Sequence, residues 1–358
     1  MNDKRLIKGR GSLSNPAGRF DKTTCVAEDD GWEPVEDESF PSPDPRTEFF
    51  PDRTRNIIAT NRSPDIPFDQ SINPYKGCEH GCIYCYARPT HAYLDLSPGL
   101  DFETKIFFKT GPVERLREAL EAPGYECKTL AIGTNTDPYQ PGEKIRRVTR
   151  RLLETLLEFR HPVSITTKGK LILRDLDLLR ELADYDLVSV AASITTLDDR
   201  LKARLEPRTA SPRARLRMVR ELAGAGIPVG VMMAPVIPFI NDNEIEDVVA
   251  RSVEAGAATV NYIMLRLPFE VKDLFAEWLA EHYPLKAEHV MNRLRDLHGG
   301  KAYRAGWGTR MRGRGPYADL VAKRFKLARR RHGLDGSRLP ALSTDLFRRP
   351  FQQRSLFE

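Results

Sequence analysis

The sequence of 358 residues predicts an α/β fold built on a partial (β/α)6 TIM-like barrel. Between about residues 56 and 270, short apolar runs alternate with amphipathic segments of helical periodicity, which is the pattern of parallel β/α units. A polar, proline-rich stretch precedes this region, and a basic stretch with helical patterns follows it. We therefore expect three parts: a largely disordered segment at 1–55, the barrel at 56–270, and a helical, basic C-terminal extension at 271–358.

The N-terminal segment lacks the pattern of a folded element. It contains the run "EDDGWEPVEDESFPSPDPR" and no sustained periodicity, so we expect most of it to be disordered or loosely draped over the barrel. Its start shows no apolar stretch typical of a secretory signal, and no run in the chain is long enough to cross a membrane. The few cysteines do not resemble a secreted disulfide framework, and we expect a cytoplasmic protein.

Six strands are expected from the apolar runs. These runs read as strands buried on both faces, as in a parallel sheet covered by helices. In chain order they lie at 70–73, 129–133, 163–167, 187–193, 229–234 and 259–265. Such a series fits a barrel better than a sandwich, and the functional residues of β/α barrels lie at the carboxyl ends of the strands.

Helices are expected between the runs. One apolar face recurs at helical spacing in the segment 143–159, and it comprises Ile145, Val148, Leu152, Leu156 and Phe159. A second helix is expected to begin after Ser211 as N-cap residue, with Pro212 at its first position, and to end at Gly224 or Gly226. The segment 241–257 follows the same plan, and two more helices are expected at the start of the extension.

The stretch "GCEHGCIYCYARPTH" at 77–91 follows the first expected strand and contains Cys78, Cys82 and Cys85. Three cysteines cannot all pair in disulfides, and a tetrahedral zinc site needs a fourth ligand. Three thiolates spaced Cys-x3-Cys-x2-Cys can hold three irons of a [4Fe–4S] cluster and leave the fourth iron open. Gly77 and Gly81 give the loop room to wrap such a cluster.

The cysteine spacing, the aromatic Tyr84 before the last cysteine, and the position after the first barrel strand resemble the radical S-adenosylmethionine (SAM) superfamily. The stretches "GTNTDPYQP" and "EPRTASPRAR" resemble its spore photoproduct lyase-like branch, whose bacterial members are often labelled DNA repair photolyases. The resemblance covers about residues 65–270. It implies a radical SAM enzyme that reductively cleaves SAM at a [4Fe–4S] cluster and so starts hydrogen abstraction from a substrate. It also implies an external electron donor, flavodoxin- or ferredoxin-like.

The resemblance also implies where SAM binds, at successive strand ends. The residues after the second strand match the place where the superfamily binds the methionine ammonium, and they are Thr134, Asn135, Thr136 and Asp137. Ser193, after the fourth strand, is placed to touch the ribose, and Arg208 beside Glu206 to clamp the carboxylate. The residues expected to flank the adenine are Met233, Pro235 and Tyr84.

One departure from the branch bears on the reaction. Spore photoproduct lyase has a hydrogen-donating cysteine at the end of its second strand, where this chain has Gly133 and Thr134. Cys127 precedes that strand and should therefore lie at the opposite, amino-terminal end of the barrel. We expect it to be a buried, small apolar side chain there. Tyr139, in the loop after the strand, is predicted as a substitute hydrogen-atom relay. An unrelated radical reaction is equally compatible with the sequence.

The C-terminal region is basic. From Lys301 to Glu358 there are 15 Lys or Arg and 4 Asp or Glu, whereas the whole chain has a net charge of +6. A basic tail on a mildly acidic body indicates a polyanionic partner, and the segment 311–333 predicts phosphate contacts with a nucleic acid. A solvated charged face is the alternative.

The last residues resemble the short motif by which bacterial repair and replication proteins bind the sliding clamp. The matching residues are Gln353, Ser355, Leu356 and Phe357. A flexible terminal peptide with two adjacent apolar side chains is suited to a groove on a partner. The alternative is that the tail packs on its own barrel.

Three functional hypotheses follow. The first is a radical SAM enzyme acting on DNA or another nucleic acid. The second keeps the radical chemistry but assigns it to a peptide or small molecule, with the tail serving only solubility. The third is a non-catalytic, zinc-stabilised nucleic-acid-binding protein in which His80 or His91 joins the three cysteines, although a structural zinc ion would be unusual at the mouth of a barrel.

Overall fold

The computed structural model describes residues 7–20 and 46–350. Its main element is a seven-stranded sheet of order β10-β9-β8-β7-β6-β3-β2, in which the short β2 (Ala59–Thr60) pairs antiparallel with β3. The other neighbours pair in parallel. The parallel strands are β3 (Gln70–Ile72), β6 (Leu130–Ile132), β7 (Val163–Thr167), β8 (Val188–Ser193), β9 (Val229–Val236) and β10 (Thr259–Met264). All six coincide with predicted runs, so the partial (β/α)6 barrel is confirmed.

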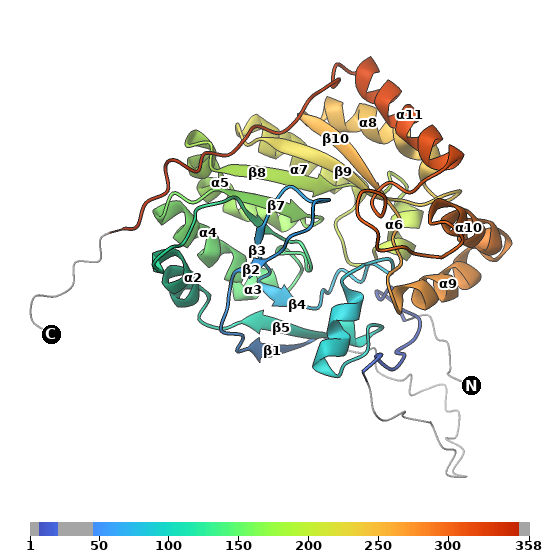
Figure 1. Ribbon diagram of the computed structural model, residues 1–358, viewed down its shortest axis with the longest axis horizontal. Coiled ribbons are helices and arrows are strands. Elements are labelled where there is room, and N and C mark those ends of the chain that lie inside the picture. Colours follow the sequence, from blue (N-terminus) through green and yellow to red (C-terminus); the bar gives the residue numbers. More distant parts are fainter. Residues whose placement is uncertain (1–6, 21–45, 351–358) are drawn as a thin grey trace, which may run out of the picture.

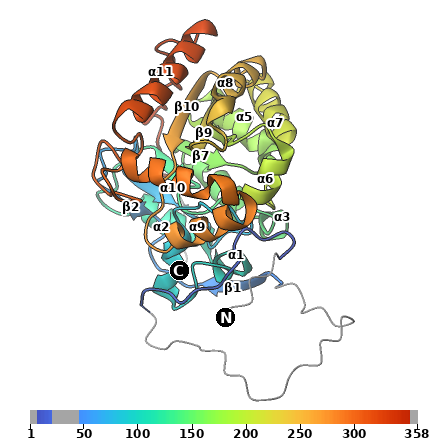
Figure 2. The ribbon, with the colours of Figure 1, turned by 90° about the vertical axis from the view of Figure 1, so that its right-hand side faces the viewer.

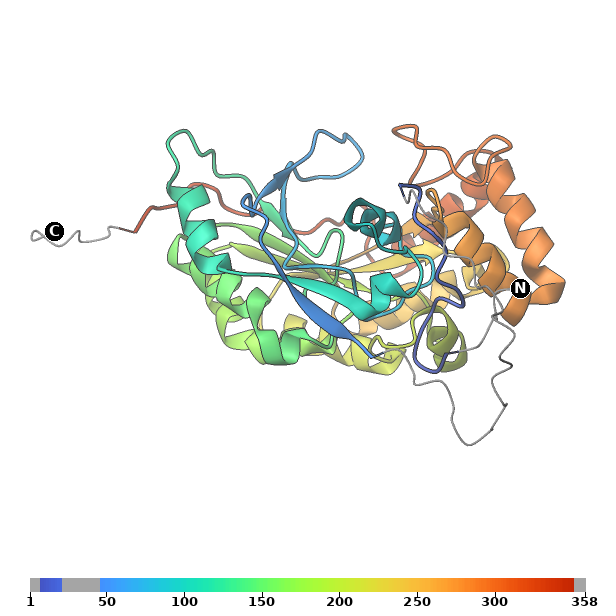
Figure 3. The same ribbon diagram turned by 90° about the horizontal axis from the view of Figure 1, so that it is seen from below.

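Helices cover the convex face of this sheet (Figures 1 and 3). The longer ones are α2 (Pro112–Glu121), α4 (Val148–Glu158), α5 (Leu176–Asp184), α6 (Asp199–Leu205), α7 (Pro212–Gly224) and α8 (Ile245–Glu254). Shorter turns are η1 (Arg88–Leu94), α1 (Asp101–Thr104), α3 (Glu143–Arg146), η2 (Lys170–Asp175) and η3 (Asp242–Glu244). The Ser211 hydroxyl accepts a hydrogen bond from the N–H of Ala214 at 3.2 Å, which confirms the predicted cap of α7.

The helix predicted over 143–159 is interrupted. Arg147 has φ of 50°, in the left-handed region, and it separates α3 from α4. Val148 and the later apolar residues of the predicted face are buried, but Ile145 is 86% exposed because it precedes the break. The prediction of one continuous helical face is therefore wrong at its first turn.

A small second sheet was not expected from the sequence. It has the order β1-β5-β4 and comprises β1 (Glu48–Asp52), β5 (Lys105–Lys109) and β4 (Tyr75–Lys76). The strand β1 belongs to the segment 1–55 that the sequence predicts to be largely disordered. Residues 7–20 of that segment also pack on the barrel, and Ser12 is fully buried. The described parts of 1–55 are thus built into the fold.

The C-terminal extension begins with helices, as predicted. These are α9 (Val271–His282), α10 (Pro284–Leu297) and α11 (Pro316–Arg331). The helix α11 lies beside α8 and β10 (Figure 2), and Phe325 stacks on Tyr262 with ring centroids 4.2 Å apart. No helix in the described ranges is both long and apolar enough to cross a membrane.

After α11 the chain crosses the amino ends of the barrel strands (Figure 1). The N–H of Ser343 donates to the carbonyl of Asp186 before β8, and the N–H of Arg348 donates to the carbonyl of Phe159 before β7, each at 2.9 Å. The guanidinium of Arg349 donates to the carbonyl of Leu120 at 3.2 Å. This strap, residues 334–350, lies at the end of the barrel opposite the carboxyl ends of the strands. The clamp-like residues at 353–357 lie outside the described residues.

Candidate active site

The cysteine loop follows β3 and β4 at the carboxyl end of the barrel. Cys78 and Cys82 are buried, Cys85 is half-buried, and all three are free of disulfides. The N–H of Cys78 donates to the carbonyl of Phe102 at 2.9 Å, and the N–H of Ile83 donates to the carbonyl of Leu205 at 3.1 Å. The loop is therefore held from two sides while its three thiols stay available.

Two glycines allow the loop to fold so tightly. Gly77 and Gly81 have φ of 79° and 67°, and a Cβ on Gly81 would lie 2.8 Å from a carboxylate oxygen of Glu103. The N-terminal segment covers the same place, because a Cβ on Gly11 would lie 1.8 Å from the carbonyl oxygen of Gly81. The loop is thus enclosed between residues 7–20 and the segment that carries Glu103.

Burial raises the pKa of all three thiols, since the interior disfavours the charged thiolate. The carboxylate of Asp137 adds to the shift at Cys78, and that of Glu206 adds to it at Cys82. Buried thiols in such surroundings become thiolates when a cationic centre binds them. Three clustered thiols of this kind fit an iron–sulfur cluster in their donor chemistry.

A buried network connects the loop to the far wall of the barrel. Glu206, with no exposed surface, accepts hydrogen bonds from the hydroxyl groups of Tyr84 and Thr195 and pairs with Arg215. The Nζ of Lys168 lies 3.2 Å from the same carboxylate. Burial alone would raise the pKa of Glu206, but the cations of Arg215 and Lys168 lower it overall. Tyr84 is thereby fixed directly beside the cysteines.

Lys168 also reaches Ser193. Its Nζ lies 2.5 Å from the Ser193 hydroxyl and 3.4 Å from the carbonyl of Ala234. This side chain therefore joins the ends of β7, β8 and β9. Sequence reasoning missed Lys168, although it follows the last residue of the third expected strand, where the strand-end rule already pointed.

The residues after β6 take two different roles in the structure. Asp137 is engaged at both oxygens, which accept from the Thr167 hydroxyl at 2.6 Å and the Lys168 N–H at 2.7 Å, and Thr136 donates to the carbonyl of Tyr75 at 3.1 Å. The side-chain Oδ1 of Asn73 accepts hydrogen bonds from the N–H of Asn135 at 2.8 Å and from the Thr134 hydroxyl at 3.3 Å. Asn135 itself is exposed. Asp137 and Thr136 thus hold the turn, and Thr134 and Asn135 lie at its open side.

Strand alternation places Met232, not Met233, on the side of Ser193. Ser193 pairs in register with Met232, and paired residues of neighbouring strands share a face. Met233 pairs with Tyr262 and is fully buried in the core. The register therefore favours Met232 over Met233 beside Ser193, and the role of either methionine toward the cofactor stays a prediction. Pro235 is buried, and its carbonyl accepts from the Asn241 amide at 3.0 Å.

Two further predicted residues have structural contacts in the described part of the chain. Tyr139 is buried in the core, where burial and the charges of Asp175 and Glu143 raise its pKa. The geometry gives its relay role no support. Arg208 contacts Glu79 at 3.4 Å and the Thr47 hydroxyl at 3.3 Å, and so it joins the loop to the N-terminal segment.

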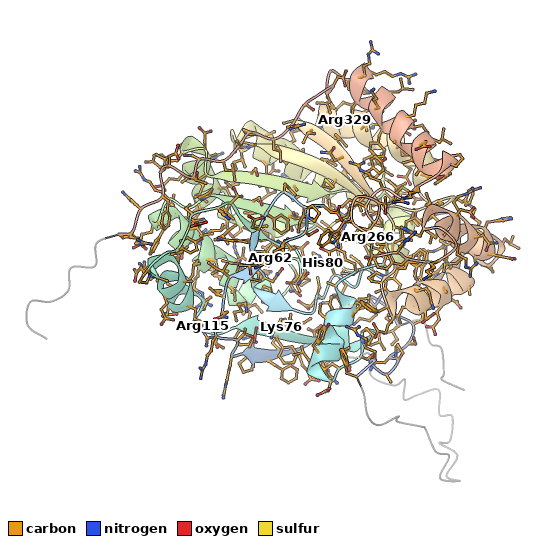
Figure 4. The ribbon with its side chains drawn as sticks, viewed as in Figure 1. Arg62, Lys76, His80, Arg115, Arg266 and Arg329 are labelled. Atoms are coloured by element: carbon orange, nitrogen blue, oxygen red, sulfur yellow. The ribbon has the colours of Figure 1, made fainter. Side chains whose placement is uncertain are left out.

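The two histidines of the zinc hypothesis each lie against another polar group, although the Nδ1 of His91 is buried without a hydrogen-bond partner. His80, near the middle of the view in Figure 4, lies 3.3 Å from the carboxylate of Asp137. The Nε2 of His91 lies 3.0 Å from the carbonyl of Lys105. In the described part of the chain, no three Cys, His, Asp or Glu side chains form a group for a single metal ion. The arrangement gives no support to a structural zinc site.

A family model described as the Radical SAM superfamily matches residues 72–251, which is half of the chain and includes the cysteine loop. The chain belongs to the radical SAM superfamily. A protein of Mycobacterium tuberculosis is 38% identical to it over 245 residues, which cover 67% of this chain and 71% of the relative. The protein is therefore a radical SAM enzyme, and the superfamily implies a [4Fe–4S] cluster and SAM.

Two solved structures are similar to this chain in fold. One is a spore photoproduct lyase complexed with dinucleoside spore photoproduct, at 17% identity and a TM-score of 0.56, covering 79% of this chain and 78% of that one. Another is a mutant of the lyase with bound AdoMet and dinucleoside spore photoproduct, at 18% identity and a TM-score of 0.54, covering 78% and 77%. These structures share the fold of this chain, in keeping with the lyase-like branch that the two stretches at 133–141 and 206–215 resemble.

Proposed function

We propose that Cys78, Cys82 and Cys85 hold a [4Fe–4S] cluster with one iron open to SAM, and that the enzyme acts on a nucleic acid. The observation that carries the first part is a single enclosed loop with three free, clustered thiols at the carboxyl end of the barrel. When bound, the cluster and SAM supply a one-electron cleavage that starts hydrogen abstraction. An external flavodoxin- or ferredoxin-like donor would supply the electron.

The chain's own residues would orient SAM and exclude water. Lys168 and Ser193 present a cation and a hydroxyl at the ends of β7 and β8, suited to polar groups of the cofactor. Thr134 and Asn135 offer further polar groups after β6. The Glu206 network holds Tyr84, which lies within the loop between Cys82 and Cys85, so that this wall need not reorganise when SAM enters.

A nucleic acid substrate is supported by the exposed basic face of α11. That face carries Lys323, Lys326, Arg330 and Arg331. Other basic residues of the extension serve the fold instead, since Arg324 pairs with Glu246 and Arg329 (Figure 4) donates to the carbonyl of Ser337. The complexes of spore photoproduct lyase with a dinucleoside photoproduct support the same substrate class.

The cluster is tested by anaerobic reconstitution and electron paramagnetic resonance with and without SAM. We expect a [4Fe–4S]+ signal that changes on adding SAM and is lost in Cys82→Ala. Cys127→Ala is the matched control, because Cys127 is half-buried before β6, at the opposite end of the barrel. Stoichiometric zinc and no iron signal would overturn the cluster.

The substrate class is tested by binding to DNA at increasing salt. A nucleic acid substrate predicts affinity that falls steeply with salt, and a smaller slope when Lys323 and Lys326 are both changed to Gln. Turnover of SAM with no measurable DNA or RNA binding would instead favour a peptide or small molecule.

We also propose that the terminal peptide binds a bacterial sliding clamp through Gln353, Ser355, Leu356 and Phe357. The strap supports this, because it leads the chain to the end of the barrel opposite the cysteine loop, where a partner leaves the substrate side open. Calorimetry with the clamp tests it. Binding is expected for the full chain and not for Leu356→Ala/Phe357→Ala, and equal binding of both would overturn it.

A further inference from the structure

Three aromatic side chains are exposed together at the rim of the barrel. Phe20 is 47% exposed, Tyr93 70% and Phe269 66%. The guanidinium carbon of Arg19 lies 4.8, 5.2 and 4.3 Å from their ring centroids, so the three rings surround one cation. A soluble surface rarely gathers large apolar side chains without a partner for them.

The group is held in place. Arg19 donates two hydrogen bonds to the carboxylate of Glu270, at 3.1 and 3.2 Å, and this fixes the cation between the rings. Phe269 has φ of 49°, a conformation that costs free energy for a bulky residue and persists only where the surroundings enforce it. A strained backbone that turns an apolar ring toward solvent is not explained by packing of the core.

The three aromatic residues lie at the end of the barrel that carries the cysteine loop, where a substrate would bind. Tyr93 lies on η1, which follows the cysteine loop, and Phe269 follows the carboxyl end of β10. The segments meet beside α9 in two views of the ribbon (Figures 1 and 3). The aromatic group therefore lies on the same rim as the three thiols.

A groove of about 830 Å³ continues from Phe269 between α9, α10 and the segment 301–305. Its cationic side chains are Lys272, Arg295 and Lys301, and Asp273 is its one acidic lining residue. Its apolar lining includes Leu267, Ala276, Met291 and Tyr303. The groove thus joins an aromatic surface to a set of cations.

We propose that this surface, Phe20, Tyr93 and Phe269 with the adjoining groove, binds unpaired nucleotides of the nucleic acid substrate. The inference rests on the proposed substrate class. Aromatic faces stack on bases of any sequence, and cations along a groove follow the phosphates. A duplex hides the faces of its bases, so a surface that offers rings favours a single strand or a strand with bases turned out. The positive charge of the groove complements the phosphates.

The test is fluorescence anisotropy of the reconstituted enzyme with labelled oligothymidylate and with a duplex of the same length. We expect tighter binding of the single strand. Tyr93→Ala and Phe269→Ala are expected to weaken it about 5- to 100-fold with the salt slope unchanged. Arg295→Gln and Lys301→Gln are expected to lower that slope by about one each.

Leu285→Ala is the matched control, because Leu285 is a 94% exposed apolar residue of α10 that does not line the groove. The affinity of this variant for the single strand should equal that of the wild type. The Tm of each variant shows whether it is folded. We expect all the variants to fold, because the substituted side chains lie at the surface. If the wild type binds the single strand but the Tyr93 and Phe269 variants bind equally well, the inference is overturned and the substrate class stands. If the wild type binds neither DNA nor an oligouridylate of the same length, both are overturned, while the cluster test is unaffected.

Discussion

Arg88 and Glu103 form an ion pair behind the cysteine loop in which neither side chain has exposed surface, with nitrogen and oxygen 2.5 Å apart. Arg88 also donates to the carbonyl of Cys82 at 3.0 Å. Glu103 accepts the N–H groups of Gly11 and Ser12 at 3.0 and 2.9 Å. One buried pair therefore fixes both the loop that carries the thiols and the N-terminal segment that covers it.

Glu103→Gln should destabilise the protein by about 3–5 kcal/mol, because it leaves the Arg88 guanidinium buried without its counter-charge. Urea unfolding of the apo protein measures this. The double variant Arg88→Met/Glu103→Leu should not recover the loss, because it leaves the carbonyl of Cys82 and the N–H groups of Gly11 and Ser12 buried without their partners. Glu221→Gln is the control, because its pair with Arg217 is exposed and worth about 1 kcal/mol or less. Equal effects of Glu103→Gln and Glu221→Gln would contradict the role of the pair.

Gly81→Ala should lower stability more than Gly124→Ala. Both glycines have positive φ, so each alanine loses about 1 kcal/mol or somewhat more to backbone strain. Only at Gly81 does the new Cβ meet Glu103, whereas nothing lies within 4 Å at Gly124. Thermal unfolding of the two variants measures the difference. Iron content should fall in Gly81→Ala alone, and equal iron content in both would contradict a tight loop.

The sequence predicted what depends on local pattern. The six parallel strands were predictable because strands buried on both faces leave continuous apolar runs, as at Val188–Ser193. The strap and β1 were not, because their partners lie far away in the chain: Arg348 pairs with Phe159, and β1 pairs with β5. Arg147 was missed because a helical face continues in the sequence across a residue that leaves the helix in the structure.

The site was predicted unevenly for the same reason. The cysteines were recognisable because their spacing is local. The buried ion pairs of Glu206 with Arg215 and of Arg88 with Glu103 are visible only when the fold brings the segments together. Met232 and Met233 could not be told apart in the sequence, because strand side chains alternate with a period of two residues and one position places the side chain on the opposite face.

Met232 and Met233 should respond differently to alanine. Met233→Ala should cost about 2–5 kcal/mol of stability, since it empties part of the core. Met232→Ala should cost less, because Met232 is only half-buried, and it should change the Kd for SAM instead. Unfolding and calorimetry with SAM separate the two effects. A larger effect of Met233→Ala on SAM binding than on stability would support the original expectation.

The pH dependence of stability should include a contribution from His161. Its ring has no exposed surface, lies against Tyr125 and Phe347, and has its pKa lowered to about 4 by burial. Below the ordinary histidine pKa of about 6.5, His161 is protonated in the unfolded chain but stays neutral in the folded one. The free energy of unfolding therefore falls as the pH falls toward 4.

Between pH 7 and pH 5 this loss should be about 2 kcal/mol. His161→Gln, which does not titrate, should lack it, while groups common to both proteins cancel in the comparison. Urea unfolding of the two apo proteins at both pH values gives the difference. Because Phe347 belongs to the strap and packs on the same ring, protonation of His161 should loosen the strap first. Parallel pH profiles of the wild type and His161→Gln would show that the ring titrates normally and that the strap does not enclose it.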